Sequence, residues 1–336
     1  MGFVRLLPRS SSRSRNGAEE ADVADEIELE ADVSDLDADE VVDLPALEEL
    51  PVVDDGPAVA STPVSSAPVV VPRAPAPGAT GTRIIALANQ KGGVAKTTTT
   101  LNLGVAFKEM GYRVLLVDLD PQGNLTMSQG LNPDTIETSM FDVLVRKIPI
   151  SDVIETREVD LAVASIDLAG AELALAALIG RERSLEKALF EVRDRYDFIL
   201  IDTPPSLGLL TINAFVAATG VIVPVQCEYL ALRGLVQLEN TLAMVRENLN
   251  PKVGVEGIVP TMYDARTLHA REAVEILEEN FGDLVFKTRI RKTVRYAEAP
   301  VKGSSVLGYD PTGTAAEVYR DLAKEVLHGA EAREHA

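Results

Sequence analysis

The chain contains very little cysteine: Cys227 is the only one among 336 residues. A disulfide within the chain is therefore excluded, and so is a metal or iron–sulfur site that needs paired cysteines from one chain. We expect Cys227 to be a buried packing residue. Tryptophan is absent, and no helix-turn-helix pattern is present, so we do not expect sequence-specific reading of DNA bases.

Long apolar runs are also missing, although hydrophobic residues make up 46% of the chain. No stretch reaches the roughly 18 consecutive apolar residues that a membrane-spanning helix needs. The start, MGFVRLLPRSSSRSR, lacks an apolar core of about 7–15 residues, so we expect no signal peptide. The final residues, HGAEAREHA, show no amphipathic face for a membrane surface. These absences predict a cytoplasmic protein without a membrane anchor.

Positive charge is scarce in the first part of the chain. The whole sequence has 32 Lys and Arg against 52 Asp and Glu, a formal net charge of −20. Residues 1–80 hold five Arg, no Lys and 17 Asp or Glu, so they carry −12 of that charge. A Pro/Ala/Val/Ser-rich tract, 57–78, follows the acidic stretch and suits an extended linker. We predict a disordered extension over 1–81, with a partner-docking role or mimicry of DNA charge left open.

From Thr82 onward, short apolar runs alternate with segments of helical spacing. The apolar runs are typical of strands buried on both faces and lie at 83–88, 112–118, 197–202, 220–225, 255–261 and 284–290. The helical segments include 97–111, 184–196 and 270–282. This alternation indicates an α/β fold with a mostly parallel sheet and helices on both faces. We predict one domain over 82–330 and a short tail at 331–336.

A glycine-bearing turn, QKGGVAKTT, stands at 90–98 between the first predicted strand and the first predicted helix. The backbone N–H groups of such a turn and the positive end of the next helix hold phosphate. Lys96 is expected to contact the β- and γ-phosphates, and Thr97 to place its hydroxyl on Mg²⁺. The ordinary pattern, GxxxxGK followed by Ser or Thr, is not met, because Gln90 and Ala95 occupy its glycine positions.

The sequence resembles the ParA/Soj family of deviant Walker A ATPases, which partition chromosomes and plasmids. The family signature, KGGxxKT followed by Ser or Thr, stands at 91–98. Blocks in the family order agree over 83–328 and include VLLVDLDPQGN, YDFILIDTPPSLGLLTINA, VPVQCEYLALRGL, TMYDART, VRYAEAP and AAEVYRDLAKEV. The resemblance implies a P-loop NTPase fold, with ATP and Mg²⁺ as cofactors. It implies a nucleotide site made of Lys91, Gly92, Gly93, Val94, Ala95, Lys96, Thr97 and Thr98.

The resemblance also implies catalytic roles for two lysines. Lys96 places a cation on the ATP of its own subunit, where charge accumulates in the transition state. Lys91, the signature lysine, reaches across a nucleotide sandwich into the ATP of the other subunit, like an arginine finger supplied in trans. A solvated loop lysine is the alternative interpretation of Lys91.

Three aspartates end predicted strands, at the edge where open α/β sheets bind ligands. Asp118 and Asp120 are two residues apart, so their side chains can face the turn together. By resemblance, Asp120 positions the attacking water and Asp118 supports the metal region. Asp202 resembles the Walker B carboxylate that holds Mg²⁺ through water. The alternative for Asp118 and Asp120 is a structural role as helix caps.

Ala95 departs from the family, which often has glycine at this position. A left-handed backbone there would cost an alanine about 1–2 kcal/mol. We predict that ATP binding survives, because Lys96 and Thr97 remain.

The resemblance implies non-specific binding of double-stranded DNA by the ATP-bound homodimer. Arg266 in TMYDART and Arg295 in TVRYAEAP match family positions for this contact. Further cations that extend the basic patch are Arg271, Lys287, Arg289, Arg291 and Lys292. The family often has proline where this chain has Arg291, and basic residues where it has Thr312 and Thr314. Local ion pairs on the surface are the alternative for Arg266 and Arg295.

The sequence therefore predicts an ATP-driven dimer switch for chromosome or plasmid partitioning. Its intrinsic ATP hydrolysis is expected to be slow, and a ParB-like partner to stimulate it. The protein is expected in the cytoplasm, associated with the nucleoid. Two alternatives remain: the same switch positioning another cargo, and a P-loop metabolic enzyme of the dethiobiotin or cobyrinate synthase type.

Overall fold

The computed structural model of the protein describes residues 81–228 and 231–334. The predicted acidic extension, apart from Gly81, and residues 335–336 of the predicted tail lie outside the described residues. Within the described ranges, no helix is both long enough and apolar enough to cross a membrane.

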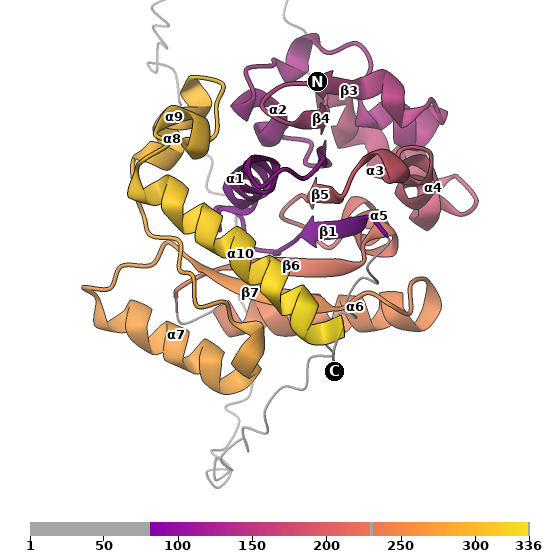
Figure 1. Ribbon diagram of the computed structural model, residues 1–336. Helices are drawn as coiled ribbons and strands as arrows, with labels where there is room; N and C mark the ends of the chain where they lie inside the picture. Colours follow the sequence, from indigo (N-terminus) through magenta and orange to yellow (C-terminus); the bar gives the residue numbers. More distant parts are fainter. Residues whose placement is uncertain (1–80, 229–230, 335–336) are drawn as a thin grey trace, which may run out of the picture. The chain divides into compact units, whose positions relative to one another are not determined.

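In the described part of the chain, seven strands form one sheet in the order β3-β4-β2-β5-β1-β6-β7 (Figure 1). Their bounds are β1 Arg83–Leu87, β2 Val114–Asp118, β3 Ile154–Thr156, β4 Asp160–Ala162, β5 Phe198–Asp202, β6 Gly220–Gln226 and β7 Val255–Thr261. Neighbouring strands are parallel except β3 and β4. Every residue of β1, β2 and β5 is buried, as continuous apolar runs predict. The predicted mostly parallel sheet is confirmed.

The helices cover both faces of the sheet (Figure 1). Their bounds are α1 Lys96–Glu109, α2 Asn124–Ser128, α3 Ala171–Ala176, α4 Ser184–Phe190, α5 Leu209–Ala217, α6 Ala231–Asn248, α7 Leu268–Phe281, α8 Arg295–Val301, α9 Val306–Tyr309 and α10 Thr314–Glu334. On one face α1 packs against α10, and on the other α5 packs against α4 and α6.

Two predicted elements differ from the structure. The run 284–290 is not a strand: it touches β7 through an isolated bridge between Ile258 and Val285. Three consecutive polar residues, 287–289, separate buried Phe286 from buried Ile290, and the segment follows the sheet edge without continuous pairing. The helix predicted at 184–196 ends at Phe190, because the chain turns there to bury Val192 and Tyr196 beside β5.

Strands β3 and β4 were not predicted, since three residues each are too few to show a periodic pattern. Helices α1 and α7 agree with the predicted segments 97–111 and 270–282 to within two residues at each end.

Close packing fixes α1, and with it the glycine turn, against the sheet. A Cβ atom on Gly104 would lie 2.6 Å from Leu116 Cδ2, so any larger residue would force Leu116 or α1 to move. One turn further on, the ring of Phe107 stacks on Phe198 of β5 with centroids 4.1 Å apart. The start of α1 is therefore held at the carboxyl edge of the strands.

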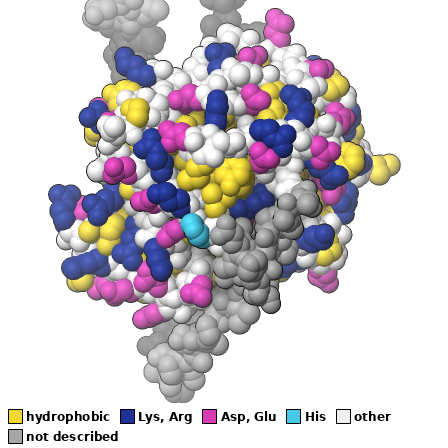
Figure 2. Space-filling model, viewed as in Figure 1, with side chains coloured by type: hydrophobic (Ala, Val, Ile, Leu, Met, Phe, Trp, Pro, Cys, Tyr) yellow, Lys and Arg dark blue, Asp and Glu magenta, His cyan; other side chains and the backbone are white. Residues whose placement is uncertain are grey.

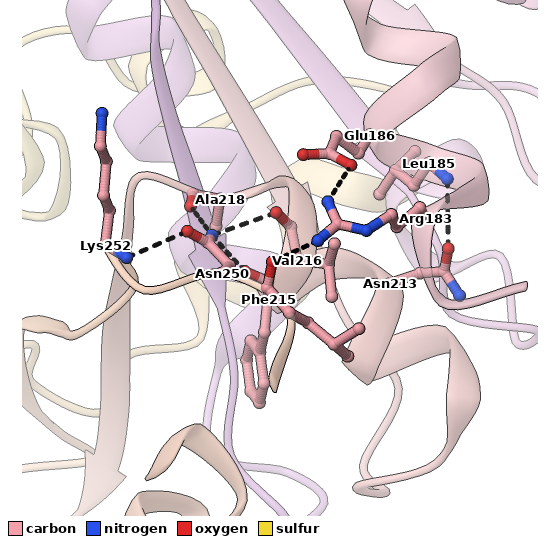
Figure 3. Close-up of polar contacts among 10 residues, drawn as sticks. Arg183, Leu185, Glu186, Asn213, Phe215, Val216, Ala218, Asn250 and Lys252 are labelled. Carbon is pink, nitrogen blue, oxygen red and sulfur yellow. Dashed lines mark hydrogen bonds and ion pairs between the residues drawn. The ribbon is translucent and has the colours of Figure 1, made fainter. Parts of the chain in front are cut away.

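Asn250 holds the chain at the amino ends of β6 and β7, opposite the strand ends that meet the glycine turn (Figure 3). Its Nδ2 group donates to the carbonyl oxygens of Phe215, Val216 and Ala218, at 3.0, 3.0 and 2.8 Å. Carbonyls at the end of a helix have no partner within the helix. Asn250→Ala is expected to lower the free energy of unfolding by about 1–3 kcal/mol, measured by urea denaturation. Lys252→Ala is the control, and an equal effect of both substitutions would contradict this role.

Candidate nucleotide site

The glycine turn connects the carboxyl end of β1 to the start of α1. Two of its residues are left-handed: Gly93 has a φ of 73°, and Ala95, directly before α1, has a φ of 65° and a ψ of 32°. Such residues turn successive backbone N–H groups toward one concavity, which binds anions. Ala95 therefore has the left-handed backbone that favours glycine and strains an alanine.

Ala95→Gly should relieve this strain. We expect the free energy of unfolding to rise by roughly 1 kcal/mol, because the relief exceeds the added entropy of the unfolded chain. Thermal unfolding measures the change, and a calorimetric isotherm should show Mg·ATP affinity equal to or higher than that of the parent. Ala106→Gly, inside α1, is the control and should destabilise. A less stable Ala95→Gly protein would contradict the strain.

Side chains from outside the turn hold both of its ends. At the start, Asn89 Oδ1 accepts from the Lys91 N–H at 3.0 Å, and Asn89 Nδ2 donates to the Pro224 carbonyl at 2.8 Å. Near the other end, the Thr261 hydroxyl donates to the Val94 carbonyl at 3.1 Å. The turn is thereby fixed to the ends of β6 and β7.

The turn opens onto a cavity of about 640 Å³. Its lining combines polar groups, from the turn itself, Lys96, Thr97 and Asp120, with apolar side chains, from Met127, Met262, Ala297, Pro300 and Val301. Backbone donors and a cation together with apolar surface suit a phosphate ester with a flat base. The sequence did not predict the apolar lining, because its residues come from segments far apart in the chain.

The hydroxyl expected from the sequence bonds directly to Asp202, and the expected cation, Lys96, feels its charge. Lys96 is 6% exposed, and burial lowers its pKa while the charges of Asp202 and Asp120 oppose that shift. The Thr97 hydroxyl donates to Asp202 Oδ2 at 2.6 Å, and the Thr100 hydroxyl donates to Asp202 Oδ1 at 3.2 Å. Burial, followed by the charge of Asp118, raises the pKa of Asp202 to about 8. A fully buried carboxylate beside a hydroxyl offers the hard oxygen ligands that Mg²⁺ prefers.

Asp118 and Asp120 lie together but in different surroundings. Asp118 is fully buried: its Oδ1 accepts from the Asp120 N–H at 3.2 Å, and its Oδ2 accepts from the Thr126 N–H and hydroxyl at 2.9 and 2.7 Å. Burial raises the pKa of Asp118 to about 6. Asp120 lines the cavity, and its Oδ1 accepts from the Gln122 N–H at 3.0 Å. Asp120 therefore faces the cavity, while both oxygens of Asp118 are engaged by the protein.

Lys91 does not line the cavity of its own chain. Its side chain is 50% exposed, and its Nζ donates to Gln226 Oε1 at 2.9 Å and to Glu228 Oε2 at 2.5 Å. Gln226 and Glu228 lie in the block VPVQCEYLALRGL, but the sequence alone predicts no role for either, because they meet Lys91 only through the tertiary fold.

The arginines predicted to contact DNA lie outside the cavity and form local ion pairs. Arg266 pairs with Asp264 at 2.7 Å. Arg295 pairs with Glu298 at 3.0 Å and with Asp310 at 3.6 Å. Of the other cations in the predicted patch, Arg289 pairs with Glu278 at 2.9 Å.

The parallel sheet, the phosphate-binding turn before α1 and the aspartate that ends the adjacent strand β5 define a P-loop NTPase. A family model described as an AAA domain matches residues 82–255. The sporulation initiation inhibitor protein Soj of Bacillus subtilis is 49% identical over 247 residues, which are 73% of this chain and 98% of Soj. The chromosome partitioning protein ParA of Caulobacter vibrioides is 43% identical over 250 residues, 73% of this chain and 94% of that protein. The chain belongs to the ParA/Soj family.

Solved structures agree with the fold. The crystal structure of cobyrinic acid a,c-diamide synthase from Mycobacterium smegmatis, with bound ADP and magnesium, has a TM-score of 0.66 and 41% identity. It covers 74% of this chain and 96% of the other. The complex of McdA from Cyanothece with ATP has a TM-score of 0.64, 20% identity, and coverage of 75% and 96%. At that identity, the second comparison shows the fold alone.

Proposed function

We propose that this protein is a Mg²⁺-dependent ATPase that switches between a monomer and an ATP-bound homodimer. The position of Lys91 carries this proposal. Lys96 supplies the cation within the cavity of its own chain, whereas the Lys91 ammonium is held at the surface by Gln226 and Glu228. Lys91 is the other lysine of the family signature and does not line the cavity of its own chain. Its position is explained if it completes the cavity of another copy.

The residues of the cavity fit ATP and Mg²⁺. The backbone of the turn, Gly92–Thr98, would hold the phosphates, with Lys96 on the β- and γ-phosphates. Thr97 and, through water, Asp202 would hold Mg²⁺, while Asp118 supports this region by fixing the backbone at Asp120. The metal, when bound, neutralises charge on the phosphate oxygens. The M. smegmatis structures with bound ADP or an ATP analogue and magnesium support this pair of cofactors.

Hydrolysis in this proposal depends on two groups of the chain. Asp120 faces the cavity and orients the attacking water through its carboxylate. Lys91 of a second copy adds a cation where negative charge grows on the transferred phosphoryl group. Turnover by an isolated subunit is slow because that cation is missing until two copies pair.

The ATP dimer is proposed to bind double-stranded DNA without sequence preference, through Arg266 and Arg295. Pairing doubles the number Z of phosphate contacts, and the slope of log affinity against log salt is roughly −0.9Z. A modest basic surface is then sufficient in the dimer and weak in the monomer. A ParB-like partner that stimulates hydrolysis would release the DNA, so the protein would act in the cytoplasm on the nucleoid, in chromosome or plasmid partitioning.

Light scattering and DNA binding, measured with Mg·ATP, with Mg·ADP and without nucleotide, test the proposal. The expected result is a doubled mass and retention of duplex DNA with ATP only, and faster phosphate release when a ParB-like partner and DNA are added. A mass that stays the same at saturating Mg·ATP would overturn the dimer switch and the DNA binding that depends on it.

One observation favours a second candidate function, a small-molecule amide former. The M. smegmatis structure described as cobyrinic acid a,c-diamide synthase is 41% identical to this chain. This candidate predicts ATP consumption that depends on a carboxylic acid substrate and is indifferent to DNA. Phosphate release measured with a cobyrinate-type acid and an amide donor, against DNA and a ParB-like partner, separates the two. A switch of the same kind that positions another cargo predicts the same DNA dependence with a different partner.

A further inference from the structure

The side chain of Glu158, in the turn between β3 and β4, receives hydrogen bonds from two segments that are far apart in the sequence. Its Oε2 accepts from the Ser305 N–H at 2.6 Å and from Gln129 Nε2 at 3.1 Å. Its Oε1 accepts from the Ser304 hydroxyl at 2.9 Å and from the Ser305 hydroxyl at 3.3 Å. One carboxylate therefore joins the end of α2 to the junction of α8 and α9.

The backbone of Glu158 is held in place as well. Its N–H donates to Gln129 Oε1 at 3.2 Å, and Lys108 Nζ, from α1, donates to its carbonyl oxygen. Gln129 and Glu158 thus exchange two hydrogen bonds. A side chain that is itself fixed in this way can fix the position of the groups that it binds.

Glu158 differs from the carboxylates on the surface around α8 and α10. On that face, acidic side chains lie among Lys and Arg (Figure 2), and Glu298, for example, pairs with Arg295 at 3.0 Å. Glu158 is half-buried, and within residues 81–228 and 231–334 its carboxylate accepts from neutral groups and pairs with no cation. What Glu158 does for the protein therefore depends on the two segments that it joins.

The end of α2 and the end of α8 also meet directly. Gly130 and Gly303 both have a left-handed backbone, with φ of 77° and 67°. A Cβ atom on Gly303 would lie 3.1 Å from Gly130 Cα, so the two backbones approach without a side chain between them. Glu158 binds the neighbours of both glycines, which are Gln129 on one segment and Ser304 on the other.

Both helices that meet here line the nucleotide cavity. The lining includes, from α2 and α8, the residues Asn124, Met127, Ser128, Ala297, Pro300 and Val301. Glu158 itself does not line the cavity. In the proposed function the phosphates occupy the turn, 92–98, so the base of ATP lies against the rest of the lining. Most of the remaining lining side chains come from α2 and α8.

We propose that Glu158 is a positioning residue for the base of the nucleotide: it sets the spacing of α2 and α8, and so the fit of the base against them. This inference rests on the proposed function, because it concerns the ATP that the cavity binds. Glu158 acts through the two helices and makes no contact with the nucleotide. A misfit of about one methylene group in an apolar pocket costs roughly 10-fold or more in discrimination.

The test compares the affinities for Mg·ATP and for magnesium tripolyphosphate, both measured by displacement of a fluorescent ATP analogue from the full chain. Tripolyphosphate has the three phosphates of ATP and no base, so its affinity depends on the phosphate-binding turn. Glu158→Ala should weaken ATP binding by roughly 10-fold or more and leave tripolyphosphate binding close to that of the parent. Glu155→Ala is the control and should change neither, because Glu155 is an exposed residue of β3 that pairs with Arg157.

Glu158→Gln tests whether geometry or charge matters. The amide oxygen can replace Oε2 as the acceptor for the Ser305 N–H and Gln129 Nε2. The amide nitrogen then faces two serine hydroxyls, which can accept hydrogen bonds as well as donate them. The link between the two helices is kept, so the ATP affinity of Glu158→Gln should stay close to that of the parent.

Three results would overturn the inference: parent ATP affinity in Glu158→Ala, an equal loss of affinity for ATP and tripolyphosphate, or a Glu158→Gln protein as weak for ATP as Glu158→Ala. If Glu158→Ala does not fold, Gln129→Ala breaks the link at α2 alone and should likewise weaken the binding of ATP and not that of tripolyphosphate. A parent that does not bind Mg·ATP would instead contradict the proposed function, whatever the variants of Glu158 do.

Discussion

Lys91→Ala is expected to bind Mg·ATP and yet remain a monomer, with ATP turnover lowered by about 10³-fold or more. Its ammonium is half exposed and lies outside the cavity of its own chain, so its removal leaves the phosphate-binding turn and Lys96 in place. What is lost, in the proposed dimer, is the cation that a second copy would supply. Phosphate release under DNA and partner stimulation measures turnover, light scattering measures mass, and a calorimetric isotherm measures nucleotide binding.

Two variants make this expectation specific. Lys96→Ala should lose nucleotide binding itself, because Lys96 is buried and lines the cavity. Glu228→Gln keeps the shape of the side chain but removes the charge that holds Lys91, so dimerisation should need less ATP than in the parent. A Lys91→Ala protein that doubles its mass with ATP and turns over at the parent rate would show that Lys91 is only a solvated loop lysine.

The part of the fold that the sequence could predict is the part buried on both faces. β1, β2 and β5 are continuous apolar runs because helices cover them on each side, and that pattern needs no knowledge of their neighbours. The run 284–290 has a similar apolar composition, so it was wrongly predicted to be a strand. Its apolar residues face the sheet edge, but only scattered backbone bonds join it to β7. Pairing is a property of two segments, and one segment's composition does not determine it.

The residues of the candidate site also fall into two groups, those that the sequence could predict and those that it could not. Residues that act through their own local backbone, such as Ala95 with its left-handed φ, could be identified from the turn pattern. Residues that meet only through the tertiary fold could not: Glu228 lies 137 positions after Lys91, and Val301 lines the same cavity as Gly92. The engagement of Arg266 by Asp264 was one of two open interpretations, and only the side-chain geometry decided that the ion pair forms.

Asp120→Asn is expected to lower ATP turnover by about 10²–10⁴-fold and to leave a long-lived ATP dimer on DNA. The carboxylate of Asp120 lines the cavity, and one of its oxygens accepts from the Gln122 N–H, so the other is left to orient water. The amide keeps the size and the bond to Gln122 but loses the negative charge. Phosphate release gives the rate, and the lifetime of DNA retention after ATP is chased with ADP gives the persistence of the dimer.

Asp118→Asn is the informative control, because the two aspartates differ in burial and in partners. Asp118 Oδ1 accepts from the Asp120 N–H, so an amide nitrogen in that position would face a donor and disturb the segment. We therefore expect Asp118→Asn to lower the unfolding temperature, whereas Asp120→Asn should leave it nearly unchanged. Equal loss of stability in both variants, or parent turnover in Asp120→Asn, would contradict the division of roles between the aspartate that faces the cavity and the one that supports it.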